Sequence, residues 1–135
     1  MSKFRCKCGN VISDVRCPNE VTGNILSDKS GEAFFDELAS IIDDFFACYR
    51  DGRVAEWRAK HFTDIYPKDL SPGNMLHDAL HGLYLNLRLA MMECDQCGRL
   101  WIQESAGKNM YHSYYFEGKD QRPKVLGLNE IEKSK

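Results

Sequence analysis

Two pairs of closely spaced cysteines, one near the start of the chain and one far downstream, constrain the fold more than any other feature. The first pair is Cys6-Lys7-Cys8-Gly9 and the second is Cys94-Asp95-Gln96-Cys97-Gly98. Each has the form of a metal-binding knuckle, in which two thiolates lie on a tight turn and a following glycine lets the backbone fold over the ion. Because tetrahedral Zn²⁺ takes four such ligands, the sequence predicts one structural zinc held by Cys6, Cys8, Cys94 and Cys97.

A single ion at this site would join segments from both ends of the chain and enclose everything between them. We therefore expect an α+β fold, with a small antiparallel sheet, a split zinc ribbon, and a helical insertion at about residues 28–90. The insertion should contain two long helices and one short helix. The 135 residues fit one domain, which we place at residues 1–118. Residues 119–135 are polar and are expected to form a loosely ordered tail.

Helical periodicity is clearest in residues 31–50, where apolar side chains fall on one half of the helical wheel and acidic ones on the other. Asp28 or Ser30 can cap this helix. Residues 54–62 predict a shorter helix, and Ser71-Pro72 suits the start of a third. Strands are expected at residues 3–8, 11–15 and 22–27, around Met91 before the second cysteine pair, and at residues 100–103 and 110–116. The apolar half of the first helix contains Phe34, Phe35, Leu38, Ile41, Ile42, Phe45, Phe46 and Tyr49.

Composition indicates a soluble protein, with 43% hydrophobic residues, 28% charged residues and a net charge of −2. The start of the chain lacks a secretory apolar segment, and no apolar run approaches the roughly 18 residues that span a membrane. We therefore expect a cytoplasmic protein without membrane contact. In that compartment six cysteines favour metal binding or free thiols over disulfides. Cys48 fits a core position, and Cys17 is an alternative ligand to Cys8.

Thiol redox chemistry at Cys94 and Cys97 is an alternative to a structural metal, and it requires a thiolate with a lowered pKa. Such motifs usually lie at a helix N-terminus, whereas residues 98–102 have the pattern of a strand. The chain also lacks a glycine-rich nucleotide loop and a nucleophile in a recognisable setting. We therefore expect a protein without enzymatic activity.

An acidic surface is the main candidate for binding a partner. Residues 28–56 contain eight acidic and three basic residues, a local net charge of −5. A fixed acidic face can dock a basic protein, because complementary charge speeds encounter and selects partners. The same face could instead serve only to keep a helix soluble. His77 and His81 lie four apart, so that one side of a helix presents both, but no third metal ligand is evident. The predicted partner-binding residues are Asp36, Glu37, Asp43, Asp44, His77 and His81.

Binding of single-stranded nucleic acid is the competing function. Basic residues of the ribbon, close in sequence to aromatic ones, could contact phosphates while bases stack on the rings. Strand alternation would bury about half of these aromatic side chains, however, and the chain as a whole is mildly acidic. A protein partner is therefore the preferred expectation. The residues concerned are Lys3, Arg5, Lys7, Arg16, Arg99, Trp101, Tyr111, Tyr114, Tyr115 and Phe116.

Both ends of the chain resemble segments of a group of small, largely uncharacterised bacterial zinc-ribbon-like proteins. The opening is Phe4-Arg5-Cys6-Lys7-Cys8-Gly9-Asn10-Val11-Ile12-Ser13-Asp14, and the closing is Cys94-Asp95-Gln96-Cys97-Gly98-Arg99-Leu100-Trp101-Ile102. The resemblance covers roughly a third of the chain and implies a zinc-bound, non-catalytic protein. Small proteins of this kind resemble immunity proteins, which inhibit interbacterial toxins. A basic toxin domain is therefore the specific partner that the resemblance suggests.

Overall fold

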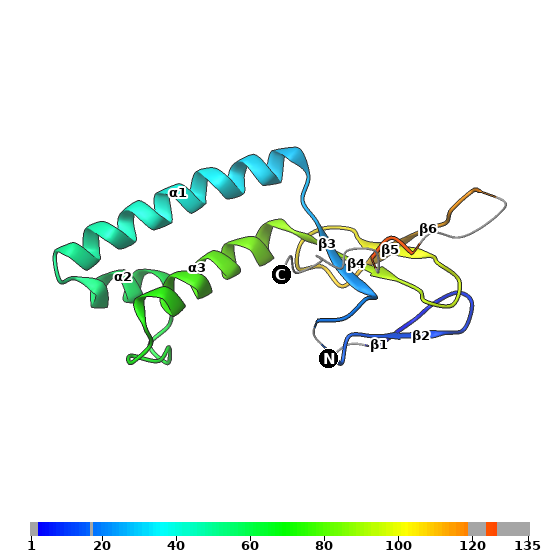
Figure 1. Ribbon diagram of the computed structural model, residues 1–135, viewed down its shortest axis with the longest axis horizontal. Helices are drawn as coiled ribbons and strands as arrows, with labels where there is room; N and C mark the ends of the chain where they lie inside the picture. The colour runs from blue at the N-terminus through cyan, green and yellow to red at the C-terminus, as the bar shows by residue number, and fades with distance from the viewer. Residues whose placement is uncertain (1–2, 17, 119–123, 127–135) are drawn as a thin grey trace, which may run out of the picture. The chain divides into compact units, whose positions relative to one another are not determined.

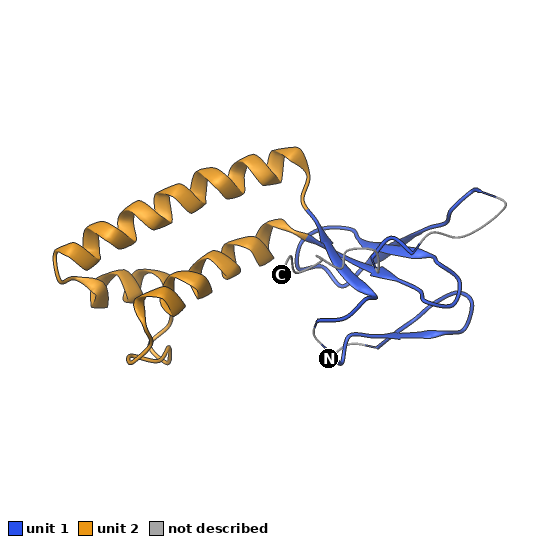
Figure 2. Cartoon of the chain, in the orientation of Figure 1, with its two compact units in different colours: residues 1–25, 89–135 blue, residues 26–88 orange. Residues whose placement is uncertain are grey.

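A computed structural model describes residues 3–16, 18–118 and 124–126 of the chain. The chain divides into two compact units, one formed by residues 1–25 and 89–135 and the other by residues 26–88 (Figure 2). The architecture is α+β, as predicted, with three helices and two antiparallel sheets among the described residues. The predicted helical insertion coincides with the second unit. The grouping of residues 1–118 as one domain stays a prediction.

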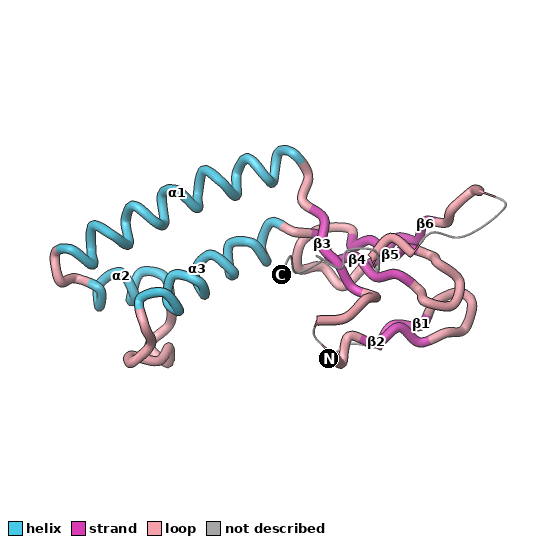
Figure 3. The backbone as a smooth tube through the Cα atoms, viewed as in Figure 1, coloured by secondary structure: helices cyan, strands magenta, loops and turns pink. Residues whose placement is uncertain are grey.

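The first unit contains both sheets (Figures 1 and 3). The N-terminal hairpin pairs β1 (Lys3–Arg5) with β2 (Val11–Ser13) and forms a sheet of its own, where one small sheet was expected. Its strands are only three residues long and are joined by the tight knuckle turn, so they pair with one another. The other sheet has the order β3 (Thr22–Ile25), β4 (Leu89–Glu93), β5 (Leu100–Gln103) and β6 (Tyr111–Tyr114).

The core of the first unit lies against one face of the four-stranded sheet. Met92 and Trp101 are register partners on β4 and β5, so their side chains share that face, and both are buried. Phe4 of β1 packs edge-on against Trp101, with ring centroids 4.6 Å apart, and also contacts Tyr111 at 5.5 Å. The buried thiols of this unit, Cys6 and Cys94, belong to the same cluster, together with Ile12.

The second unit consists of α1 (Asp28–Arg50), α2 (Val54–His61) and α3 (Pro72–Leu87), with α1 packed against both of the other helices. Ser71 caps α3 as predicted, and its hydroxyl accepts a hydrogen bond from the Asn74 N–H at 3.2 Å. At α1 the cap is Ser27, which accepts from the Ser30 N–H at 3.1 Å, and neither Asp28 nor Ser30. The helix therefore begins one residue earlier than the first candidate cap allowed.

Trp57 of α2 is the centre of the helical core and is 1% exposed. Its ring packs edge-on against Phe45 of α1 with centroids 4.8 Å apart, and Cys48 and Met75 complete the buried cluster. Cys48 is thus a core residue, as its position in the sequence indicated. Burial of these side chains provides most of the hydrophobic stabilisation of the second unit.

The apolar half of α1 is wider than the face that the second unit buries. Phe35, Phe46 and Tyr49 are 65%, 60% and 54% exposed, although they belong to the apolar half of the predicted helical wheel. Phe45 and Cys48, one residue before Phe46 and Tyr49, are buried instead. Successive residues on a helix point about 100° apart, so the two sets form separate stripes, one inside and one outside.

Candidate metal centre

The sulfur atoms of Cys6, Cys8, Cys94 and Cys97 all lie within 4.8 Å of one another. The Sγ–Sγ distances are 3.5 Å between Cys6 and Cys97 and 3.6 Å between Cys8 and Cys94, so each contact joins the N-terminal knuckle to the later one. Zn–S bonds of about 2.3 Å in a tetrahedron would place the sulfurs about 3.8 Å apart. The four side chains therefore match the size of a tetrahedral thiolate site.

Short hydrogen bonds shape both knuckles. In the first, the Gly9 N–H donates to the Cys6 carbonyl at 2.9 Å, and the Cys6 N–H donates to the Asn10 carbonyl at 2.8 Å. In the second, the Gly98 N–H donates to the Cys94 carbonyl at 2.7 Å, and the Cys94 N–H donates to the Arg99 carbonyl at 2.9 Å. Gly9 and Gly98 have φ angles of 93° and 65°, which only glycine adopts without strain.

Asn10 joins the two knuckles directly. Its Nδ2 atom donates to the Cys94 sulfur at 3.5 Å and to the Asp95 carboxylate at 2.6 Å. A thiolate ligand accepts such a bond readily, so Asn10 orients Cys94 toward the cluster. Neither the sequence pattern nor the spacing of the ligands singled out this residue; its only signal is its place directly after the first glycine.

The thiols of the cluster do not titrate alike. Burial raises the pKa of Cys6, but hydrogen bonding to the Cys8 main chain and to the neighbouring thiols outweighs it and lowers the pKa to about 6. The buried Trp101 ring N–H also favours this thiolate, although it makes no well-formed hydrogen bond. Burial and the other three cysteines raise the pKa of Cys97 to about 12. Without a cation the cluster thus favours a thiolate at Cys6 and opposes one at Cys97, a conflict that a bound metal ion would remove.

The arrangement argues against a redox pair at Cys94 and Cys97. A redox pair needs one reactive thiolate with a lowered pKa, and Cys97 is not that thiolate, because burial and the neighbouring thiols raise its pKa. The motif also leads into β5 and not into a helix, so no helix N-terminus stabilises a thiolate there. Both residues instead face Cys6 and Cys8, which a two-cysteine redox motif would not require.

The predicted partner-binding acids lie along α1. Asp36, Glu37 and Asp43 are exposed. Asp44 is half-buried and accepts a hydrogen bond from the Lys60 ammonium of α2 at 2.7 Å, which lowers the pKa of its carboxyl. Asp44 is therefore already engaged within its own unit.

His77 and His81 stack on α3 with ring centroids 5.8 Å apart, and the His77 Nδ1 lies 3.1 Å from Asp78. Within the described part of the chain, the four-cysteine cluster is the one group of three or more His, Cys, Asp or Glu side chains close enough to hold a metal ion. The two histidines thus belong to no such group, and their role in partner binding stays a prediction. Cys17, the alternative ligand, lies outside the described residues.

Glu93 is a buried residue that the sequence analysis missed. It is 3% exposed and directly precedes Cys94. Its carboxylate accepts hydrogen bonds from the main-chain N–H groups of Val125 at 3.0 Å and Leu126 at 2.8 Å. These belong to the predicted tail, whose residues 119–123 and 127–135 lie outside the described part. The signal available in the sequence was one acidic residue at the end of the otherwise apolar strand Leu89–Glu93.

No curated protein and no solved structure matches the chain. A family model does match it, over residues 2–118, and that family is described as a domain of unknown function, DUF8617. The match includes both knuckles and the whole helical unit, and ends before the tail. The chain therefore belongs to the DUF8617 family.

Proposed function

We propose that the chain is a non-catalytic protein-binding module whose sheet unit is held by one structural Zn²⁺. The donor set supports zinc, because four thiolates at tetrahedral spacing suit a borderline-soft ion with no geometric preference of its own. Cys6, Cys8, Cys94 and Cys97 would fill all four positions, leaving none for water or substrate. A closed shell of this kind stabilises a fold and does not catalyse.

Metal analysis of the full chain tests the zinc proposal. Protein purified without added metal should contain one zinc per chain, and Cys94→Ser should lose it. Cys48→Ser is the matched control, because Cys48 is a buried thiol in the helical core and lies outside the cluster. Stoichiometric iron in place of zinc would contradict the choice of metal. Retention of the metal in Cys94→Ser would contradict the ligand set.

The observation that carries the protein-binding proposal is the surface of α1. Exposed carboxylates of Asp36 and Asp43 border the exposed rings of Phe35 and Phe46 along the same helix. Large exposed apolar side chains rimmed by charge are typical of protein interaction sites. Complementary charge then selects a basic partner. A cytoplasmic location, where thiols stay reduced, is consistent with this proposal.

Inhibition of an interbacterial toxin is the specific form of this function that the sequence resemblance suggested. A toxin domain with a basic active site or substrate path would provide the complementary charge for Asp36, Glu37 and Asp43. His77 and His81 are secondary contacts in this proposal, since both are exposed on α3. The toxin itself stays a prediction.

Charge reversal tests the acidic surface. Asp36, Glu37 and Asp43 are changed to lysine together, while Asp44 keeps its bond to Lys60, and the variant is compared with wild type in affinity capture from a bacterial lysate. A direct partner should be captured by wild type and lost from the variant, with zinc content and helicity unchanged. Glu20→Lys with Glu117→Lys is the control, because both residues are exposed and lie in the sheet unit. Equal capture by all three proteins would contradict the proposal.

Nucleic-acid binding is the second candidate, and one set of contacts favours it. The Arg99 guanidinium lies 4.8 Å from the Tyr115 ring centre, and Tyr114 and Phe116 are about half exposed nearby in the sequence. Trp101, by contrast, is 8% exposed and already covered by Phe4, so it offers no stacking platform. A salt titration against single-stranded DNA tests this candidate, since phosphate binding weakens steeply with salt. Binding that Arg99→Glu abolishes would favour it over the protein partner.

A further inference from the structure

The exposed stripe of α1 has the spacing of a coiled-coil seam. Phe35, Ala39, Ile42, Phe46 and Tyr49 follow one another at intervals of four, three, four and three residues. This alternation is the heptad pattern by which one helix packs against another along its length. The helical unit leaves most of this stripe uncovered, since Phe35, Phe46 and Tyr49 are more than half exposed. The seam is therefore a helix-packing surface without a helix on it among the described residues.

We propose that this seam binds a second copy of the chain, with the two α1 helices antiparallel and Ile42 near the two-fold axis. In that register Phe35 lies opposite Tyr49 of the other copy. Ala39 lies opposite Phe46, so a small residue faces a large one and the side chains can interdigitate. A two-fold pairing of this kind is self-complementary, and each contact away from the two-fold axis occurs twice.

Charge along the edge of the seam selects the antiparallel orientation. Asp36, Asp43 and Arg50 occupy this edge at intervals of seven residues. In an antiparallel pair Asp36 of each copy lies opposite Arg50 of the other, which gives two attractive contacts. Asp43 lies opposite Asp43 of the other copy, which gives one repulsive contact. In a parallel, in-register pair every charge lies level with its own copy, so no opposite charges meet. Two attractive contacts against one repulsive contact favour the antiparallel dimer.

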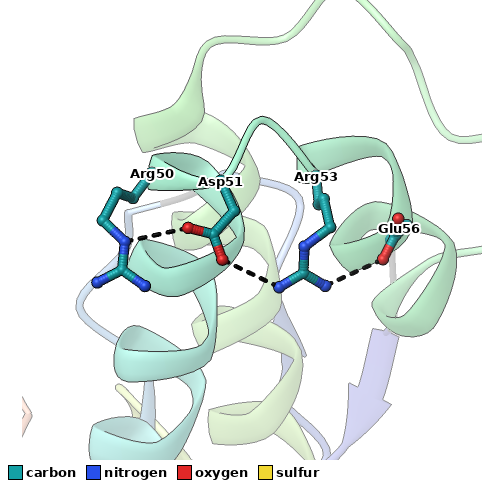
Figure 4. Close-up of polar contacts among 4 residues, drawn as sticks. All are labelled: Arg50, Asp51, Arg53 and Glu56. Carbon is teal, nitrogen blue, oxygen red and sulfur yellow. Dashed lines mark hydrogen bonds and ion pairs between the residues drawn. The ribbon is translucent and has the colours of Figure 1, made fainter.

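Arg50 is free to make this contact. It is 78% exposed, and its bond to Asp51, 3.1 Å long, is a surface ion pair between neighbouring residues (Figure 4). Such pairs contribute little, so exchanging Asp51 for Asp36 of the second copy costs little. Arg53 also bonds Asp51, at 3.2 Å, so that carboxylate keeps a partner when Arg50 turns away.

The dimer does not depend on the proposed partner. Phe35, Phe46, Asp36 and Asp43 also belong to the proposed partner surface, so a partner and a second copy would compete for the seam, whereas Glu37 lies away from the seam and stays exposed. Because sedimentation of the pure chain needs no partner, it tests the dimer proposal separately from the partner-binding proposal, and either can be refuted without the other. A monomer would overturn the dimer and leave the proposed function in place.

Sedimentation equilibrium of the zinc-loaded chain in reductant, from micromolar to millimolar concentration, tests the dimer. The mass should rise with concentration from 15.5 kDa toward twice that value. Phe46→Lys should stay monomeric, because a charge replaces an aromatic anchor on both copies. Phe116→Lys is the matched control, since Phe116 is 46% exposed and lies in the sheet unit, and it should dimerise like wild type. A wild-type monomer throughout, or a Phe46→Lys dimer, would overturn the proposal.

Charge variants test the orientation. Arg50→Glu should weaken the dimer about tenfold, because two attractive contacts become repulsive, and adding Asp36→Arg should restore it. Asp43→Asn should tighten it about twofold by removing the central repulsion. A double variant as weak as Arg50→Glu alone, or a weaker dimer in Asp43→Asn, would overturn the antiparallel register.

Discussion

The buried carboxylate of Glu93 provides the sharpest test of the sheet unit. It binds two successive main-chain N–H groups, those of Val125 and Leu126, and so fixes this late segment against the end of β4. The Leu126 side chain lies over β3, where its Cδ2 would come within 2.8 Å of a Cβ atom placed on Gly23. A carboxylate with two acceptor oxygens suits this role, and an amide with one acceptor does not.

Replacing Glu93 with glutamine changes only this chemistry. One N–H keeps an oxygen acceptor, although without charge, while the other faces an NH₂ group and loses its bond. A hydrogen bond to a charged group contributes about 1.5–3 kcal/mol, and a buried donor left without a partner costs about 1–3 kcal/mol. Because both bonds are only part-buried, water offsets some of this cost. We expect local stability to fall by about 2 kcal/mol.

Amide hydrogen exchange measures this loss where it occurs. A change of about 2 kcal/mol corresponds to roughly thirtyfold faster exchange at Val125 and Leu126. Glu20→Gln is the matched control, because Glu20 is exposed and lines the same cavity of about 150 Å³ beside Glu93. Exchange at both amides should stay at the wild-type rate in that variant. Wild-type rates in Glu93→Gln would refute the reasoning, since the carboxylate would then not hold this segment.

Three further predictions concern the metal and the helical core. Chelation should unfold the sheet unit while helical circular dichroism persists, because structural zinc contributes about 10–16 kcal/mol in small zinc domains; loss of both signals would contradict two separately stabilised units. Burial lowers the pKa of His61 in the folded chain below 6.5, so as the pH falls the unfolded chain binds this proton before the folded chain does. Stability of the helical unit in urea should therefore be level above about pH 6.5 and fall as the pH drops through the folded-state pKa; an equal fall in His61→Gln would contradict this. Trp57→Ala should lower the free energy of unfolding in urea by about 3–5 kcal/mol. Phe35→Ala, at an exposed position, should lower it by about 0.5 kcal/mol. Similar losses in the two variants would contradict the assigned core.

The four-cysteine cluster could be predicted from the sequence because the geometry of each cysteine pair is set by a few neighbouring residues. Cys-x-Cys-Gly and Cys-x-x-Cys-Gly each specify a knuckle within a few residues, and one tetrahedral ion then requires that the two meet. The Ser71-Pro72 start of α3 was predictable for the same reason, since a cap acts over three residues. The cap of α1 was misplaced because Ser27, Asp28 and Ser30 all have capping side chains within one turn, and propensity does not rank them.

Contacts between distant segments left no such signal. Glu93 accepts hydrogen bonds from Val125 and Leu126, which lie more than thirty positions later in the sequence. A single acidic residue at the end of a strand does not predict which N–H groups it will bind. Asn10 likewise donates a hydrogen bond to Asp95, although the whole helical insertion separates the two residues in the sequence. These bonds form because the four-cysteine cluster and the sheet bring the segments together, so they are a consequence of the fold and the sequence alone does not predict them.

The width of the apolar face on α1 shows that hydrophobic periodicity alone does not predict which apolar residues of a helix are buried. A helical wheel separates apolar from polar residues, but it does not say how many neighbours cover the apolar half. In the second unit α2 and α3 cover the stripe that contains Phe45 and Cys48, and leave the stripe that contains Phe35 and Phe46 exposed. One apolar half-wheel thus divides into a surface that stabilises the unit and a surface free for assembly. Since the four-cysteine cluster lies in the sheet unit and Trp57 is the centre of the helical core, substitutions on the outer stripe can change assembly with little effect on either fold.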